Sequence, residues 1–294
     1  MTNVIAPTPP PEAPAPQLSS GARTTLRVGL IVTASVLLVA VLVTLAGLAF
    51  GVSRFRVVAE SSPLPNTLRT LEIDIESAPA AVRIRSERSI DEPRVDMRMI
   101  NSTGADARPL SVSADGTSAR VSVDPESSHL LRRARAGEIT VVLPEAIARR
   151  LNVTIRQQMG VVFADADLDQ LTARTRDGAV VLSGSARSID IDSENGEIVS
   201  RRPISVSETF RAVTGTGDVS VEFAATAETV EVGSRTGDVV VSLPSPGPYV
   251  VDATTGSAHG NTVVGVPQTR DRDQALAVIT ARSDTGDVAV NDAG

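Results

Sequence analysis

The sequence predicts an all-β fold and, within that class, a β-solenoid with coils of about 20 residues. Two observations predict it. Glycines recur at intervals of 18 to 21 residues, apart from a last interval of 30, and apolar residues stand at fixed distances from each glycine. Such self-similarity is typical of stacked repeats, in which each unit buries its apolar side against its neighbours. The turn glycines are Gly160, Gly178, Gly196, Gly217, Gly237, Gly256 and Gly286.

Three apolar columns accompany these glycines. The seventh and fifth residues before each glycine are apolar, as in Val230 and Val232 before Gly237, and the residue between them is polar in every unit but one. The second residue after each glycine is apolar too, as in Val239. Alternation with period two indicates a strand with one buried face. Each unit is therefore predicted to form a strand, a tight turn at glycine and a second strand.

Glycine suits this corner because a chain that reverses direction within two or three residues commonly needs a positive φ. A stacked corner also leaves room only for small inner side chains. The residue three positions before the glycine is small in the last six units: Thr175, Ser193, Thr214, Ser234, Ala253 and Ser283. A β-sandwich or a propeller is the alternative, but neither requires the same columns at fixed offsets, and a propeller blade takes about 40 residues.

The N-terminal part of the chain is predicted to hold the domain at a membrane. Residues 1–25 are Pro-rich, which favours an extended, disordered tail. Residues 26–53 are predicted to form one transmembrane helix, because the stretch Val28–Ser53 carries no charge and as a helix would be about 39 Å long. A cleaved signal peptide is the alternative, although its apolar region would be shorter.

The orientation follows from the usual arrangement of single-pass proteins. Arginines flank the apolar stretch on both sides, at Arg23 and Arg27 before it and at Arg54 and Arg56 after it, so the positive-inside rule does not decide. A short tail inside and a large acidic domain outside is the common topology. We therefore expect a bacterial cytoplasmic (inner) membrane protein with its N-terminus inside and its C-terminal domain extracytoplasmic.

Between the helix and the regular coils, two segments are expected. Residues 54–67 are predicted to form a stalk, and residues 68–150 an irregular β lead-in that caps the first coil of the regular solenoid at 151–294. Within the lead-in, Asp115-Gly116 lies between two alternating runs and predicts a hairpin. The segment Pro144–Arg150 is expected to form one helical turn.

Three kinds of motif mark the predicted extracytoplasmic part, about 68 to 291: Leu71-Glu-Ile-Asp-Ile, Glu138-Ile-Thr-Val-Val-Leu-Pro144 and the Thr-Gly-Asp-Val corners at Thr216, Thr236 and Thr285. With these motifs it resembles the bacterial "putative adhesin" β-solenoid family, a group of domains of unknown function often found behind a membrane helix. The resemblance implies the solenoid fold and a surface role, and it brings no catalytic or binding residues.

Composition excludes several classes of function. Cys is absent, so the chain has no disulfide, thiol nucleophile or thiolate metal site. The net charge of −7 weighs against a nucleic acid, and five Phe, one Tyr and no Trp offer few stacking platforms. The two histidines, His129 and His259, are far apart, and no nucleophile-elbow, phosphate-loop or EF-hand motif occurs. We predict no catalytic residues, no cofactor and no enzymatic activity.

An acid follows the turn glycine in four units, at Glu197, Asp218, Asp238 and Asp287, with Ser257 interrupting the series. In a stack these like charges would repel unless a cation or a hydrogen-bond donor intervened. One hypothesis is a weak divalent-cation ladder at Glu197, Asp218 and Asp238. The other is that each acid accepts backbone amides at its own corner, as Asp commonly does in turns.

Five arginines are candidates for a basic stripe on the otherwise acidic rod: Arg174, Arg176, Arg201, Arg202 and Arg235. Such a stripe would meet anionic wall polymers or lipid head groups. The alternative is that these arginines pair with neighbouring acids such as Asp190 and Asp192, which is the commoner fate of charges on a protein surface.

These features predict a membrane-anchored, extracytoplasmic β-solenoid that acts as a non-enzymatic, adhesin-like interaction module of the cell envelope. Its partners would be the membrane and a cell-wall polymer or an envelope protein. One alternative is an envelope sensor that works through a membrane partner, because the short tail holds no output domain. The other is a polysaccharide-acting solenoid enzyme, which generally needs wider coils and longer loops than this sequence offers.

Overall fold

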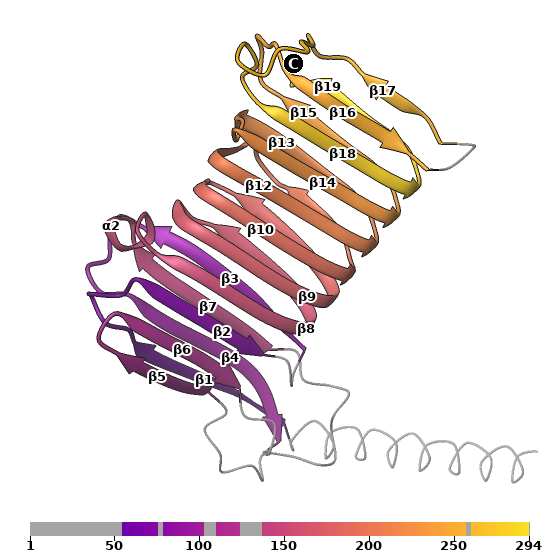
Figure 1. Cartoon of the computed structure of the whole chain (residues 1–294). Coiled ribbons are helices and arrows are strands. Elements are labelled where there is room, and N and C mark those ends of the chain that lie inside the picture. The colour runs from indigo at the N-terminus through magenta and orange to yellow at the C-terminus, as the bar shows by residue number, and fades with distance from the viewer. Residues whose placement is uncertain (1–54, 76–78, 103–109, 124–136, 257–259, 294) are drawn as a thin grey trace, which may run out of the picture. The chain divides into compact units, whose positions relative to one another are not determined.

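The computed structural model (Figure 1) describes residues 55–75, 79–102, 110–123, 137–256 and 260–293. The predicted tail (1–25), the predicted transmembrane helix (26–53) and both histidines lie outside these residues. In the described part of the chain, no helix is long and apolar enough to cross a membrane. The residues from Phe55 onward form one compact unit that consists mainly of β-strands, so the all-β prediction is confirmed.

Each coil has one strand before the glycine corner and one after it. The strands before the corner lie side by side in parallel and form what we call the first face. Along the stack, this face consists of β6 (Ser118–Val123), β2 (Thr70–Ile75), β8 (Asn152–Asp165), β9 (Leu168–Ser183), β10 (Ser185–Asn195), β12 (Ile204–Thr216), β14 (Thr229–Thr236), β18 (Val278–Thr285) and β16 (Val250–Thr255).

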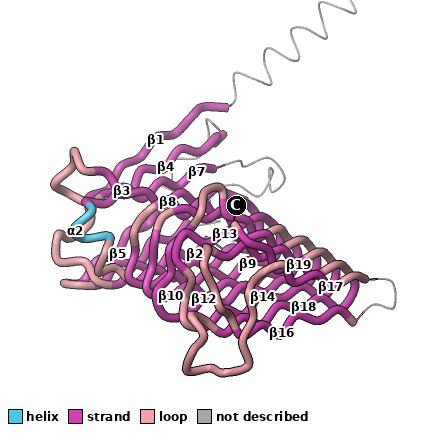
Figure 2. Tube along the Cα trace, turned by 90° about the horizontal axis from the view of Figure 1, so that it is seen from above, coloured by secondary structure: helices cyan, strands magenta, loops and turns pink. Residues whose placement is uncertain are grey.

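The strands after the corner form the second face, again in parallel, and β8 and β9 run through the corner and so contribute to both faces. Figure 2 shows the stack from above, with the helix α2 near one end. Along the stack, the second face consists of β7 (Gly137–Pro144), β3 (Ala80–Glu87), the ends of β8 and β9, β11 (Ile198–Ser200), β13 (Val219–Ala225), β15 (Val239–Leu243), β19 (Val288–Asp292) and β17 (Thr262–Val264).

The apolar core lies between the two faces. The predicted columns point into it: Val230 and Val232 on β14 are buried, and so are Val239 and Val241 on β15. Val219, Val239 and Val288 follow one another in register along the second face, which is the arrangement of stacked coils and not of separate blades. Six of the seven predicted corner units show this burial pattern, and the unit of Gly256 does not.

The register of the Gly256 unit differs from the prediction. Strand β16 pairs with β18 so that Thr255, and not Ala253, stands beside Ser283. Neither Gly256 nor Gly260 has the positive φ of the other corner glycines, but Gly260 is the glycine whose backbone lies against Gly286. The prediction was wrong here because the glycine count took the first glycine of the unit as its corner.

The order of the last two coils also differs from their order in the chain. The final coil, β18 and β19, lies between the β14–β15 coil and the β16–β17 coil (Figure 1). Its corner, Thr285-Gly-Asp-Val, repeats the corner of β14–β15 at Thr236, and the two stack directly. The unit of Gly256 and Gly260 has no acid after either glycine, and it lies at the end of the acidic column described below.

The lead-in is more regular than expected. Strands β2 and β3 form a coil against β8, and β6 and β7 stack on their other side, so coil-like strands begin well before residue 151. The predicted stalk contains a strand, β1 (Phe55–Pro63), which pairs antiparallel with β4 (Arg94–Ser102). Strand β4 in turn pairs antiparallel with β7. Antiparallel strands therefore cover this end of the stack.

Two local predictions in the lead-in are confirmed. The strand β5 (Leu110–Asp115) forms an antiparallel hairpin with β6, and Gly116 in its turn has a φ of +56°. The helix α2 (Glu145–Ala148) is the predicted single turn, and it directly follows β7. Its residues Ile147 and Ala148 are buried against the core.

Candidate functional site

The glycine corner sets the geometry of every surface on the stack. Six corner glycines have φ between +132° and +159°, a range that other residues rarely adopt. Successive corners are so close that a methyl group on Gly237 would lie 2.2 Å from the carbonyl oxygen of Gly217. The corner therefore requires glycine both for its backbone angle and for the close approach of the next coil.

Several of the small residues beside the corner bond to it, whereas the buried hydroxyls of Thr175 and Ser193 have no hydrogen-bond partner. Ser234 donates its hydroxyl to the carbonyl oxygen of Gly217 at 2.7 Å, and Ser283 donates to that of Gly237 at 2.8 Å. Thr255 donates to the oxygen of Gly286 in the same way, which supports the corrected register of its coil. At the other end of this column, the side chain of Gln157 is buried and neither of its polar atoms has a hydrogen-bond partner.

The three aspartates after corner glycines, Asp218, Asp238 and Asp287, form a hydrogen-bonded column. Asp218 accepts the backbone N–H of Asp238 at 2.8 Å, and Asp238 accepts that of Asp287 at 2.8 Å. Asp287 accepts the N–H of Asn261 at 2.7 Å, which ends the column. Each carboxylate thus accepts an amide of the next coil and not of its own corner.

This bonding bears on the cation-ladder hypothesis for Glu197, Asp218 and Asp238. A backbone amide already faces one carboxylate oxygen in each of the two aspartates, and it supplies the donor that relieves their repulsion. Throughout the described residues, no three acidic or histidine side chains converge on a position where they would hold a metal ion.

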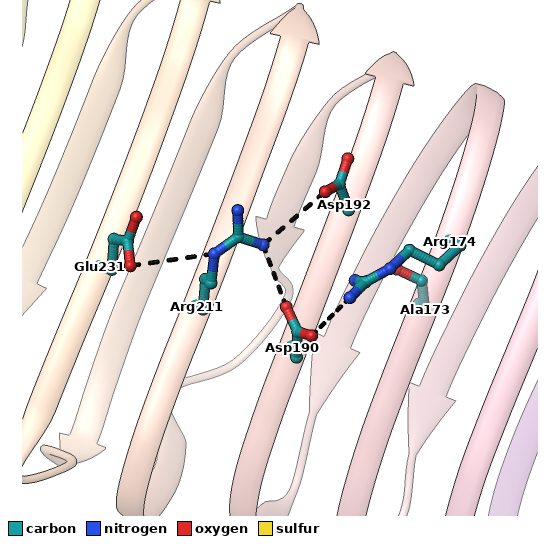
Figure 3. A network of polar contacts seen from close by, with 6 residues as sticks. All are labelled: Ala173, Arg174, Asp190, Asp192, Arg211 and Glu231. Carbon is teal, nitrogen blue, oxygen red and sulfur yellow. Dashed lines mark hydrogen bonds and ion pairs between the residues drawn. The ribbon is translucent and has the colours of Figure 1, made fainter.

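The first face neutralises its own charges. Arg174 contacts Asp190 at 2.6 Å, and Arg211 contacts Asp190 at 3.1 Å, Asp192 at 3.7 Å and Glu231 at 3.8 Å (Figure 3). Burial raises the pKa of Asp190, but the hydrogen bonds from Arg174 and Arg211 outweigh it and hold the pKa below its ordinary value.

The predicted basic stripe is therefore mostly paired. Besides Arg174, Arg176 contacts Glu194 at 3.2 Å and Arg202 contacts Asp165 at 2.6 Å. Only Arg201 and Arg235 of the five candidates make no ion pair with the described residues. The structure favours the alternative given with the stripe, in which arginines pair with neighbouring acids.

The second face carries a feature that the sequence analysis did not find. The third residue after each corner glycine points outward and is apolar in most coils. These residues follow one another in register, and only Ser220 interrupts them. We call this row the apolar stripe: Phe163, Val181, Val199, Val240, Ala289 and Val263, with Ser220 between Val199 and Val240.

The stripe is accessible to solvent. Val263, at its end, exposes 54% of its surface, and the other apolar members are half-buried by their neighbours in the row. Val161 and Ala179 lie beside the stripe and widen it toward the corner. The sequence does contain a signal for this row, since the second and third residues after the corner glycine are both apolar in most units.

At one end the stripe meets an arginine-lined groove of about 620 Å³ between strands β1, β4, β7 and β3. Arg83 of β3 lies over the ring of Phe163, 4.3 Å from its centre, and contacts Glu138 at 3.4 Å. Arg94 contacts Asp96 at 3.0 Å. Arg98 makes no ion pair with any described residue. The groove and the stripe thus form one continuous surface.

The fold and this surface define a class, a parallel β-solenoid domain with one charge-compensated face and one face that combines an apolar row with charges. The particular family is shown by a family model, toastrack DUF4097, which matches residues 133–292. The chain belongs to the toastrack DUF4097 family. The matched residues include the motif at Glu138–Pro144 and all three Thr-Gly-Asp-Val corners, while Leu71–Ile75 lies before them.

Several solved bacterial structures are similar to this chain. A "putative adhesin" from Parabacteroides merdae is 8% identical with a TM-score of 0.45, and one from Bacteroides fragilis is 13% identical with a TM-score of 0.41; each likeness covers 81% of this chain and 97% of the other. A "putative cell adhesion protein" from Clostridium sporogenes is 12% identical with a TM-score of 0.37, over 81% of this chain and 100% of the other. No curated protein matches the chain.

Proposed function

We propose that this chain is a non-enzymatic interaction module of the bacterial cell envelope. Residues 26–53 anchor it in the cytoplasmic membrane, residues 1–25 lie inside, and the solenoid faces outward. Its partner is an envelope protein or a cell-wall polymer, and it needs no cofactor. The apolar stripe on the second face is the observation that carries this proposal.

The stripe supports a binding role because its residues do not serve the core. Val239 points inward and is buried, whereas Val240, the next residue on β15, points outward. Isolated apolar residues on a surface are normal, but a contiguous row with polar rims marks an interaction site. Seven coils contribute a residue to this row, which at about 4.8 Å per strand is about 29 Å long.

The membrane topology is tested with introduced cysteines, which are unique because the chain has none. A full-length Glu231→Cys variant carries its thiol on the exposed first face, and a Thr8→Cys variant carries it in the tail. In cells whose outer layers are made permeable while the cytoplasmic membrane stays sealed, a membrane-impermeant maleimide is expected to label Glu231→Cys. The same reagent is expected to label Thr8→Cys only after lysis. The reverse pattern, or labelling of both before lysis, would contradict the proposed placement.

The binding role is tested with a photo-crosslinking amino acid at Val240 in the full-length protein in cells. The matched control carries the same amino acid at Thr172, an outward-facing, half-buried position on the first face. We expect adducts of defined mass from Val240 and none from Thr172. Equal adducts from both positions, or none from Val240, would overturn the proposal that the stripe is the binding surface.

A further inference from the structure

We propose that the second face binds a basic amphipathic α-helix of another envelope protein, and that this helix lies along the stack, across the strands. This inference rests on the proposed function and names the partner of its binding surface. It concerns the coils whose second-face strands are, in order along the stack, β11, β13, β15, β19 and β17. Three features of these coils support it: the sizes of the outward side chains, their spacing and the charges beside them.

The outward side chains of the stripe alternate in size along these coils. Val199, Val240 and Val263 carry branched side chains. Ser220 lies between the first two valines in register, Ala289 lies between the last two, and both are small. The row is therefore lower at Ser220 and at Ala289 than at the valines on either side. Because alternating large and small positions let a facing layer interdigitate, two large side chains of a partner fit these two low positions.

The spacing of the two low positions selects a helix. They are two strands apart, which is about 9.6 Å at 4.8 Å per strand. Side chains seven residues apart on a helix share one face and are separated by about 10.5 Å along its axis, so they reach both positions. In an extended chain, side chains on one face are separated by about 6.8 Å or 13.6 Å, and neither value matches. A helix of about 14 residues spans all five coils and would dock by its apolar face.

A row of acids runs beside the stripe, on the side of the glycine corner. Each acid stands two residues before a stripe residue, so the two rows point to the same side of the sheet, about 6.6 Å apart. We call these residues the acid row: Glu197, Asp218, Asp238 and Asp287. All four are exposed, and none forms an ion pair with a described residue. The strands β11, β13, β15, β19 and β17 contain no basic residue, so the cations that complement the acid row come from the partner.

The hydrogen bonds within the acid row hold it ready for such a partner. Asp218, Asp238 and Asp287 each accept one backbone amide of the next coil through Oδ1, which keeps the carboxylates in line along the stack. Their second oxygens accept no hydrogen bond from a described residue. A row of like charges attracts basic side chains and repels acidic ones. It therefore favours a helix with a basic flank over a wall polymer that carries phosphate or carboxylate groups.

Binding is measured with the full-length protein in phosphatidylcholine nanodiscs. The probe is a fluorescent, lactam-bridged helical peptide of about 18 residues, with two leucines seven residues apart and one lysine per turn along the adjoining flank. We expect saturable binding by fluorescence anisotropy after the signal of empty nanodiscs is subtracted. A peptide of the same composition, with its leucines on different sides of the helix, is expected to bind about tenfold more weakly or worse, because only one leucine can be buried.

Variants of the protein locate the site of binding. Ala289→Phe fills one low position and is expected to weaken binding of the peptide about tenfold or more. Asp218→Asn with Asp238→Asn keeps the oxygens that accept the amides and is expected to weaken binding about fivefold at low salt. The matched control, Glu208→Gln with Glu231→Gln, removes the same charge from strands β12 and β14 of the first face and is expected to leave the affinity unchanged. Urea unfolding verifies that each variant is folded.

The outcomes separate this inference from the proposed function. The inference is overturned if the peptide does not bind, if both peptides bind equally, or if the first-face control weakens binding as much as Asp218→Asn with Asp238→Asn. In cells, mass spectrometry identifies what the crosslinker at Val240 captures. A basic amphipathic helical segment supports the inference. A wall polymer, or an acidic or extended segment, overturns it while the binding role stands. If Val240 captures nothing, both proposals fall.

Discussion

The two faces of the solenoid are made from the same coils, yet they treat charge differently. On the first face, Arg174, Asp190, Arg211 and Glu231 lie on neighbouring strands and satisfy one another (Figure 3). On the second face, the outward row is apolar, and the acids that follow the corner glycines form no ion pairs with the described residues. The same repeat therefore builds one face whose outward charges pair with one another and one face whose outward row is apolar.

The difference arises from which residues the alternation points outward. Both faces bury every second residue, so the core requires only half of each strand. The outward half is free to vary, and on the first face from β10 to β14 it alternates in charge between neighbouring coils, as Asp190, Arg211 and Glu231. Because like charges on adjacent strands repel and opposite charges attract, this arrangement stabilises the stack without a partner. The outward row of the second face is apolar and therefore offers no charges that could pair in this way.

The corner that joins the two faces is where the largest effect is expected. In Gly237→Ala, the new methyl group would lie 2.2 Å from the oxygen of Gly217 at a φ of +143°, so the coils cannot stack there. We expect more than about 4 kcal/mol of destabilisation or failure to fold, since strain and lost packing both contribute. Gly116→Ala is the control, because its methyl group meets nothing within 4 Å, and about 1–2 kcal/mol is expected. Urea unfolding of both variants compares them, and equal losses would contradict the stacked corner.

The packing that holds the faces together is expected to give the next largest effect. Phe210 of the first face and Phe223 of the second meet edge to face in the core, with ring centroids 5.1 Å apart. Phe210→Ala leaves a cavity between the faces and is expected to cost about 3–5 kcal/mol. Phe163→Ala removes a ring of the same size from the outward stripe and is expected to cost far less. Similar midpoint shifts for the two variants in urea would mean that the stripe supports the fold.

The sequence allowed the columns of the core to be predicted because each is counted from a glycine whose conformation is nearly obligatory. The count failed at Gly256 because this coil contains a second glycine, Gly260, and Gly260 is the one that lies against Gly286. The order of the last two coils could not be predicted, because it depends on which corners stack best. That is a contact between Gly237 and Gly286, which are far apart in the chain.

The candidate site was predictable only in part. The stripe follows from the third residue after each glycine, so a longer column count would have found it. The arginine-lined groove could not be found in this way, because β7 lies beside β3 through pairing of residues 137–144 with residues 80–87. Such long-range antiparallel and parallel pairings set which charges share a surface, and no local pattern reports them.

A smaller effect is expected on the first face when its network is cut. Arg211→Met removes contacts to Asp190, Asp192 and Glu231, and we expect a loss of about 1 kcal/mol or less at low salt, because these side chains are partly exposed. The loss should disappear at high salt, which screens the wild-type pairs. Unfolding in urea at two NaCl concentrations measures this difference. A loss that persists at high salt would indicate packing and not charge.

The pH dependence of stability should report on the same network. The pKa of Asp190 is lower in the folded protein than its ordinary value, so the carboxylate stabilises the fold above the ordinary pKa of about 3.9. This contribution is lost as the pH falls through the lowered folded-state pKa. We expect wild type to be more stable than Asp190→Asn at pH 6 and the two to converge toward pH 3. Parallel curves of unfolding free energy against pH would contradict the network's role.

The smallest effect on stability, and the most informative for the second face, is expected at Val240. Val240→Thr keeps the β-branched shape on an outward position and should change the free energy of unfolding by less than about 0.5 kcal/mol. Val239→Thr, one residue earlier, places a hydroxyl in the core and should cost about 1–3 kcal/mol. If the stripe exists for binding, Val240→Thr should still reduce the adducts that a photo-crosslinking amino acid captures from the stripe position Val199. A variant that is fully stable and fully able to associate would show that this row contributes to neither, and the contrast between the two faces would lose its functional meaning.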